Sequence, residues 1–447
     1  MIARLSILII ASILVSCSQG TAPKMSDNTL ICTIPEQDEK VNHLIQDAEL
    51  YLDINDTDTL VSESKQKIWK QDYQKKLFSP WNKKYRFVKA SITWPWSVYK
   101  YPKGFGLNFK PYNIEWYENL KTQANLSGYP SKSLLAISVT KTHLRNYPTN
   151  LPLFYDPKKA GEGYPFDYLQ NSTLHLGEPV RITHQTLDGS WIFVEAAQAD
   201  GWVKTNAVAV IDKKSIEDIK SFQRLSVIKN DAPLVDMLGE VISTVNLGTT
   251  LSLLKEDDYF WYVQVPRRNL DGTVFFDTAM ILKEQGVIQG QHYTSTNMSK
   301  LLNEIIGRPY GWGGLYFERD CSSTMRDVFS VFGLWLPRNS SKQRTSGEYI
   351  RTKDEQSLLT LLKSRGKPYQ TLIDFKGHIG LYLGEHEGKP LIYHTLWGYK
   401  VYDGKKKGRE IIGKSVITSL YAGAGLDIDN PNGLIDRVIG LTFINVK

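Results

Sequence analysis

The middle of the chain, from Pro130 to Leu282, is a long series of short β-branched and aromatic runs separated by turn residues. Such runs lie at 180–183, 191–195 and 202–204, and again at 225–228, 250–254 and 260–265. This spacing is typical of small β-barrels, so we predict two of them in succession, at residues 130–213 and 214–290. The similarity between the two halves is too weak to define a sequence repeat.

Chain length requires further domains on both sides of this region. A chain of 447 residues is too long to fold around one hydrophobic core, since single cores stop growing at about 250 to 300 residues. Residues 17–129 show helical patterns at 64–78 and 114–123, which predict a separate N-terminal domain of mixed, mainly helical structure. Residues 291–447 are mixed, with helices expected at 299–306 and 321–332 before several strands. The predicted fold class is multidomain α+β.

The charge balance argues against a nucleic-acid partner. The chain has 54 Lys and Arg against 47 Asp and Glu, a formal net charge of +7 without long basic runs. Hydrophobic residues make up 41%, enough for large buried cores rather than disorder. We expect a globular monomer that binds no nucleic acid and uses no cofactor.

An apolar run near the N-terminus is typical of a signal-peptide core. Residues 5–15 are apolar apart from two serines and follow Arg4, but the run is too short to cross about 30 Å of hydrocarbon. The segment Leu14-Val15-Ser16-Cys17 resembles a bacterial lipobox, which implies a signal peptide at 1–16 and a lipid anchor on Cys17. The alternative is an ordinary secretory signal in which this cysteine is incidental.

The lipobox resemblance also implies a location. The protein would lie in the cell envelope, attached to a membrane by its lipid, and Ser18 implies the periplasmic face of the outer membrane if the organism is Gram-negative. Lipidation of Cys17 leaves Cys32 and Cys321, too few and too far apart for a disulfide framework. We expect Cys32 to be a small buried hydrophobe.

Cys321 follows a turn-rich segment, 308–314, and directly precedes a run with helical apolar spacing. It is therefore expected at a helix N-terminus. Unpaired amides and the positive end of the helix dipole favour a thiolate there, so we predict a lowered pKa and a usable nucleophile.

Two histidines are expected to serve this thiol. His378 begins an alternating strand and His394 ends the next one, after a polar turn. If the hairpin is centred on His386, Leu381 pairs with Leu391 and His378 lies directly opposite His394. One ring could then act as base while the other orients it. Zinc is the competing interpretation of one Cys and two His, but close-spaced ligand pairs are missing, so we expect no metal.

The motifs are specific in combination: Arg-Pro-Tyr-Gly-Trp-Gly-Gly at 308–314, Asp-Cys-Ser-Ser at 320–323, Gly-His-Ile-Gly-Leu-Tyr-Leu-Gly at 377–384, and Tyr-His at 393–394. Together they resemble the NlpC-type family of cell-wall cysteine peptidases. The segments 144–154, 161–167 and 188–203 resemble the bacterial SH3-like module found with this family, and Phe78-Ser79-Pro80-Trp81 resembles its N-terminal stabilising domain.

This resemblance implies a papain-like α+β catalytic domain at 291–447, preceded by two SH3-like barrels. It implies a cysteine endopeptidase that cleaves the γ-D-glutamyl–diamino acid bond of peptidoglycan stem peptides through a thioester. Cys321 would be the nucleophile, His378 the general base and acid, and His394 the orienting residue. The diamino acid, meso-diaminopimelate or lysine, stays open.

Substrate-binding residues are also implied. Backbone amides near Cys321, helped by the Tyr310 hydroxyl, would meet the oxyanion, although Tyr310 could instead be a packing residue in its loop. Ser322 and Ser340 match positions that approach the D-glutamate carboxylate, or serve as local hydrogen-bonding residues. Tyr164, in the loop 161–168, is expected either to wall the cleft or to pack between domains.

One departure from the family concerns Asn339. Relatives that recognise an amine carry an acidic residue in a Pro-Arg-Asp-Ser pattern, whereas this chain has Pro337-Arg338-Asn339-Ser340. A neutral amide cannot pair with an ammonium as a carboxylate can, so the enzyme is expected to accept stems still joined to glycan. The rival function is a peptidoglycan-binding scaffold that uses its barrels while the α/β domain is catalytically idle. An acyltransferase on the same thiol would need a dry acyl channel, for which the sequence gives no sign.

Overall fold

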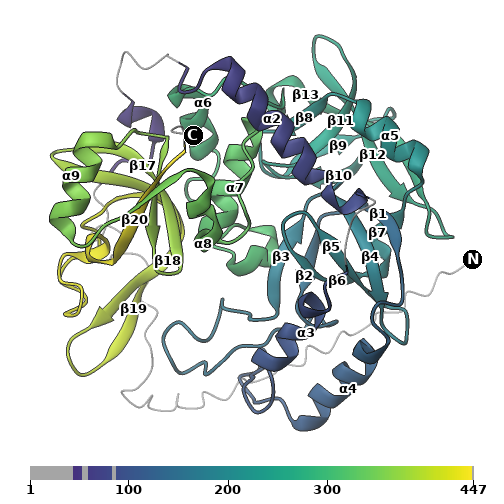
Figure 1. Cartoon of the computed structure of the whole chain (residues 1–447), viewed down its shortest axis with the longest axis horizontal. Coiled ribbons are helices and arrows are strands. Elements are labelled where there is room, and N and C mark those ends of the chain that lie inside the picture. Colours follow the sequence, from purple (N-terminus) through teal and green to yellow (C-terminus); the bar gives the residue numbers. More distant parts are fainter. Residues whose placement is uncertain (1–43, 53–58, 83–86, 445–447) are drawn as a thin grey trace, which may run out of the picture. The chain divides into compact units, whose positions relative to one another are not determined.

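The computed structural model describes residues 44–52, 59–82 and 87–444 (Figure 1). The predicted lipidation site, Cys17, and Cys32 lie outside these residues. Within the described ranges, no helix combines the length and the apolar content needed to cross a membrane.

The N-terminal region is helical. Two predicted helices are confirmed as α2 (Glu63–Leu77), capped by the Ser62 hydroxyl, and α4 (Ile114–Ala124), capped by the Asn113 side chain. A further helix, α3 (Lys89–Val98), occupies the aromatic segment between them despite the internal Pro95. Burial of Ile92 and Pro95 offsets the backbone hydrogen bond that a proline removes. Short 3-10 turns complete the region: η1 (Ala48–Tyr51), η2 (Ser79–Trp81) and η3 (Leu126–Gly128).

Residues 134–210 form a seven-stranded antiparallel sheet, ordered β3-β2-β6-β5-β4-β1-β7. Its strands are β1 (Leu134–Ser138), β2 (Thr142–Arg145), β3 (Gln170–Leu174), β4 (Pro179–Gln185), β5 (Trp191–Ala196), β6 (Asp200–Lys204) and β7 (Val208–Val210). The three predicted runs are thus confirmed as strands, but the sheet is open, with β3 and β7 at its edges. Edge strand β3 is covered by the C-terminal domain, where Gln170 Nε2 donates to the Gly313 carbonyl at 3.0 Å. The C-terminal domain thus covers the free edge of β3. In a closed barrel this edge would be paired with another strand.

A second open seven-stranded sheet follows helix α5 (Lys213–Ser221), with the order β10-β9-β13-β12-β11-β8-β14. Its strands are β8 (Arg224–Val227), β9 (Ala232–Val235), β10 (Val241–Val245), β11 (Thr250–Glu256), β12 (Phe260–Arg268), β13 (Val274–Leu282) and β14 (Gly286–Ile288). The predicted runs are strands here too. The second strand order is the first with seven added to each strand number. The two sheets therefore repeat one topology, although their sequences are too dissimilar to define a repeat.

The C-terminal domain is a six-stranded antiparallel sheet, ordered β15-β20-β16-β17-β18-β19, with helices packed beside it. Its elements are α6 (Ser295–Asn303), η6 (Trp312–Phe317), α7 (Cys321–Val331), α8 (Ser340–Gln343), β15 (Glu348–Arg351), α9 (Glu355–Arg365), β16 (Thr371–Phe375), β17 (His378–His386), β18 (Lys389–Tyr402), β19 (Lys407–Ser419), η8 (Gly433–Arg437) and β20 (Val438–Phe443). Figure 1 shows α7 between this sheet and the two earlier ones. Its apolar side packs through Met325, Val328 and Phe329 into a core shared with Ile379 and Tyr393.

A buried charge network holds α7 against the earlier sheets. The Asp327 carboxylate bonds Arg319 at 2.8 Å and Arg326 at 2.7 Å, and lies 3.4 Å from His175 Nε2. Arg319 also donates to the Leu247 carbonyl at 2.7 Å. Burial alone would raise the pKa of Asp327, but its contacts with Arg326, His175 and Arg319 hold it well below its ordinary value. The helix that carries Cys321 is therefore fixed by ionic contacts at its centre.

Candidate active site

Cys321 is the first residue of α7, as the sequence predicted. Asp320 caps the helix: its carboxylate accepts from the Ser323 amide at 2.9 Å, while the Ser323 hydroxyl accepts from the Asp320 amide at 2.9 Å. The cysteine is 8% exposed. It therefore stands in a rigid turn with its residual surface facing two cavities.

The expected thiolate is wrong for the resting site. Burial raises the pKa of the Cys321 thiol to about 12, and the adjacent Asp320 carboxylate adds to the shift. Backbone amides of Ile379 and Ser322, together with Arg338, oppose it only in part. The helix end does point at the sulfur, but its own capping carboxylate offsets the positive potential. Cys321 is therefore a thiol until a base removes its proton.

The histidines lie together, although the predicted register is wrong by two residues. Leu381 pairs with Tyr393 rather than Leu391, because the turn is Glu387-Gly388 and the ladder shifts between Tyr382 and Gly384. Continuing this register puts His394 beside Gly380. Since the side-chain period of a strand is two, both rings stay on one face. His378 Nε2 lies 2.9 Å from His394 Nδ1.

Both imidazoles are neutral at rest. Burial, followed by the nearby Arg437, lowers the pKa of His378 to about 3. Burial and the neighbouring ring lower the pKa of His394 well below its ordinary value. If His378 Nδ1 is to accept a proton, its Nε2–H must donate to His394 Nδ1. His394 Nε2–H then donates to the Thr418 hydroxyl at 3.2 Å.

Thr418 was not predicted from the sequence. It lies on β19 and is buried, and its hydroxyl ends the hydrogen-bonded series that begins at His378. Nothing in the sequence distinguishes it from other strand threonines. Its place beside His394 depends on the β18–β19 pairing.

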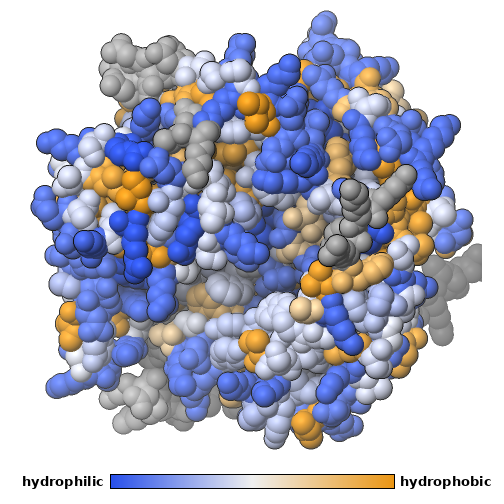
Figure 2. Space-filling view, in the orientation of Figure 1, coloured by the Kyte–Doolittle hydropathy of each residue, from blue (hydrophilic) through white to orange (hydrophobic). Residues whose placement is uncertain are grey.

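Two cavities meet at Cys321. The first, of about 350 Å³, is lined by Tyr310, Ser322, Asn339 and Ser340, four of the predicted substrate-binding residues. The second, of about 230 Å³, holds His378 and shares Tyr310 and Cys321 with the first. Figure 2 shows a hollow on this face of the molecule with a largely hydrophilic surround. Cys321 therefore lies where the two cavities adjoin.

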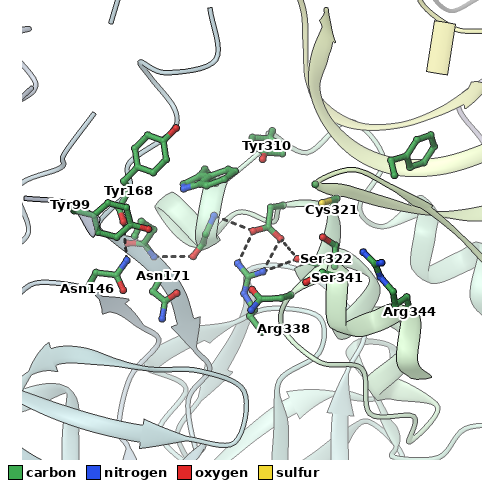
Figure 3. A pocket seen from close by; sticks show the side chains of 18 residues that line it. Tyr99, Asn146, Tyr168, Asn171, Tyr310, Cys321, Ser322, Arg338, Ser341 and Arg344 are labelled. Carbon is green, nitrogen blue, oxygen red and sulfur yellow. Dashed lines mark hydrogen bonds and ion pairs between the residues drawn. The ribbon is translucent and has the colours of Figure 1, made fainter. Parts of the chain in front are cut away.

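An internal ion pair controls the charge of the first cavity (Figure 3). Arg338 bonds the Asp320 carboxylate at 2.6 Å and the Ser322 hydroxyl at 2.9 Å. Burial alone would raise the pKa of Asp320, but Arg338 and the Ser323 bonds leave it lowered. Arg338 was not among the predicted site residues, because its contact with Asp320 depends on the chain folding back after α7.

The first β domain supplies part of both cavities. Tyr168 and Asn171 line the first, and Gly161 and Phe166 line the second. Tyr164 lines neither: it is 54% exposed and packs edge-on against Trp397, with ring centroids 6.2 Å apart. The loop 161–168 therefore contributes to the wall of the cleft through its neighbours rather than through Tyr164. In the described part of the chain, no group of three His, Cys, Asp or Glu side chains is arranged to hold a metal ion.

The structure brings together a cysteine at a helix start and a histidine pair on an antiparallel sheet. Comparison with protein families identifies three regions of the chain. The NlpC/P60 family matches residues 307–395, which contain Cys321, His378 and His394. The NLPC_P60 N-terminal stabilising domain matches 6–129, and the SH3 domain of the SH3b1 type matches 152–204. Along the chain, a stabilising domain and an SH3 domain thus precede an NlpC/P60 domain.

One solved structure shares the fold over most of the chain. An NlpC/P60 endopeptidase from Photobacterium damselae subsp. piscicida superposes with a TM-score of 0.80 at 23% identity, covering 90% of this chain and 97% of that one. An NlpC/P60 family protein from Bacillus cereus reaches a TM-score of 0.48 at 18% identity, covering 70% of this chain and 99% of that one. Among curated proteins, none matches this chain. The first match shows that one fold extends over most of the length.

Proposed function

We propose that the protein is a peptidoglycan hydrolase, a cysteine endopeptidase that cleaves the γ-D-glutamyl–diamino acid bond of stem peptides. One observation carries the proposal: Cys321 at the start of α7 shares a cavity with His378, whose other nitrogen bonds His394. The NlpC/P60 family match over these residues supports it. A papain-like catalytic fold is part of the same proposal.

Chemistry begins from the neutral pair. As the sulfur bonds the γ-carbonyl carbon of D-glutamate, the thiol proton passes to His378 Nδ1. Charge on the carbonyl oxygen would be met by backbone amides near Cys321, with the Tyr310 hydroxyl beside them. His378 then gives its proton to the amine as the C–N bond breaks, and water hydrolyses the thioester. His394 holds the His378 ring through each transfer.

The acyl part of the substrate would lie in the first cavity. Ser322 and Ser340 would approach the D-glutamate carboxylate, while Asn339 is exposed at the rim. Because Asn339 carries no charge, an acetylated or glycan-linked L-Ala should be accepted as readily as a free amine. We further propose a signal peptide at 1–16 and a lipid anchor on Cys17, which would place the enzyme in the cell envelope. We also propose that it is a monomer.

The test is cleavage of defined stem peptides by purified protein, read by product mass. Each substrate is offered with a free L-Ala amine and with that amine blocked by muramic acid. We expect release of the diamino acid fragment by the wild type and none by Cys321→Ala. The proposal fails if both proteins give the same products, which would leave the idle scaffold as the better account.

A further inference from the structure

The second cavity is strongly basic. Arg409 on β19, Arg437 at the end of η8 and Lys376 line it, and among the described residues around it there is no Asp or Glu. Both arginines are half-buried. Trp397 and Leu396 give the same cavity an apolar wall. It is therefore shaped for a ligand with an aliphatic stem and a negative end.

The two guanidinium groups are not neutralised by an acidic partner. Within the part of the chain that the structure describes, neither forms an ion pair, and Arg409 Nη1 donates to the Gly398 carbonyl at 3.2 Å. Burial and then the charge of Arg409 lower the pKa of Arg437, with only partial opposition from Asp427. Two like charges held together in a half-buried site are costly unless an anion joins them.

The position of Arg409 is also fixed by the first β domain. Gly161 has a φ of +83°, and a Cβ placed there would lie 3.1 Å from the Arg409 guanidinium. The loop thus closes tightly over this side chain, which limits its rotamers. A fixed guanidinium loses less entropy when it binds a carboxylate through two parallel hydrogen bonds.

The cavity lies on the leaving-group side of the thiol. The residue that protonates the departing amine must reach it, and His378 lines this cavity but not the first one. A substrate bound across Cys321 would therefore place its diamino acid among Arg409, Arg437 and Trp397. This assignment rests on the proposed function.

We propose that Arg409 and Arg437 bind the side-chain carboxylate of a diamino-dicarboxylic acid, so that the enzyme selects diaminopimelate-type stems over lysine-type stems. Lysine presents an ammonium where diaminopimelate also has a carboxylate, so the same cavity repels one and attracts the other. The aliphatic stem of either residue would lie on the Trp397 wall.

The experiment measures kcat/KM on three amine-blocked substrates: L-Ala–γ-D-Glu–meso-diaminopimelate–D-Ala, its L-lysine counterpart, and the lysine tripeptide with a free main-chain carboxylate. The wild type should prefer the diaminopimelate peptide by about 10- to 100-fold, the range of one charge-assisted hydrogen bond. Arg409→Gln and Arg437→Gln should each raise KM for the diaminopimelate peptide far more than for the lysine tetrapeptide, so that most of the preference is lost.

Lys400→Gln is the matched control. Lys400 pairs with Arg409 across β18 and β19 but is exposed and lies outside the second cavity. It should keep the preference. Equal wild-type rates on both tetrapeptides, or equal losses on both in the arginine variants, would overturn the inference and leave the proposed hydrolysis standing. An effect confined to the lysine tripeptide would assign the arginines to a main-chain carboxylate and overturn the side-chain assignment.

Binding supplies a readout that does not need catalysis. In a Cys321→Ala background, calorimetry should give a Kd for the diaminopimelate peptide that rises about 10- to 100-fold with Arg437→Gln. If the wild type cleaves none of these peptides, the proposed function fails, and the calorimetry still decides the inference. An unchanged Kd would overturn it.

Discussion

Thr418→Val tests whether the histidine pair depends on the hydroxyl behind it. His394 is fully buried and Thr418 is 1% exposed, so valine would leave the His394 Nε2–H without its acceptor in a dry site. An unsatisfied buried donor costs about 1–3 kcal/mol. The free energy of unfolding should fall by about that amount. If the missing acceptor costs the transition state, in which His378 carries the extra proton, a further ~1–3 kcal/mol beyond its cost to the resting enzyme, kcat/KM falls by roughly 5- to 140-fold, at about 1.4 kcal/mol per tenfold.

The assays are stem-peptide cleavage and urea unfolding on the same preparations. Thr418→Ser is the control, because it keeps the hydroxyl and should restore most of the activity. A role limited to packing would leave valine, which keeps the shape of threonine, near the wild type, and would make serine, which lacks the methyl group, the poorer variant. Wild-type activity in Thr418→Val, or equal loss in both variants, would refute the hydrogen-bonded series from His378 to Thr418.

Further predictions concern pH and the domain contact. The pKa of His378 is about 3 and that of Cys321 about 12, so the pH profile of kcat/KM should lack the fall near pH 6.5 that an ordinary histidine gives. Its acid limb should lie near pH 3 instead. Arg437→Gln should move this limb to higher pH, because the charge of Arg437 lowers the pKa of His378. A histidine whose folded pKa is lowered stabilises the fold above its unfolded value of about 6.5, so the thermal midpoint should fall as the pH drops below that value toward 3. Gly313→Ala should lower both stability and activity, because its φ is +61° and the new Cβ would collide with the Gln170 carbonyl of β3; wild-type melting in this variant would contradict the contact.

Local signals account for what the sequence predicted correctly. Asp320 and Ser323 form a capping box around Cys321. This motif lies within four consecutive residues, so it can be recognised in the sequence. The strand alternation around His378 and His394 placed both rings on one face. That result survived the error in register because the bulge and the Glu387-Gly388 turn shifted the pairing by two residues, an even number.

Tertiary contacts account for what the sequence missed. A helix N-terminus predicts a lowered cysteine pKa, whereas burial and the Asp320 carboxylate raise the pKa of Cys321 instead. Edge strand β3 of the open first sheet is covered by η6, a contact between domains that local strand patterns do not show. Arg409 and Arg437 lie on different elements, so no motif joins them before the sheet and η8 bring them into one cavity.

The central claim is that the Cys321 sulfur carries the acyl group. A γ-thioester of L-Ala–D-Glu with a good leaving group should acylate the enzyme faster than the acyl-enzyme hydrolyses, and intact mass after acid quench then measures the adduct. We predict one L-Ala–γ-D-Glu group on Cys321 in the wild type and none in Cys321→Ala. Product release without an adduct at any time, or an equal adduct in Cys321→Ala, would contradict the account.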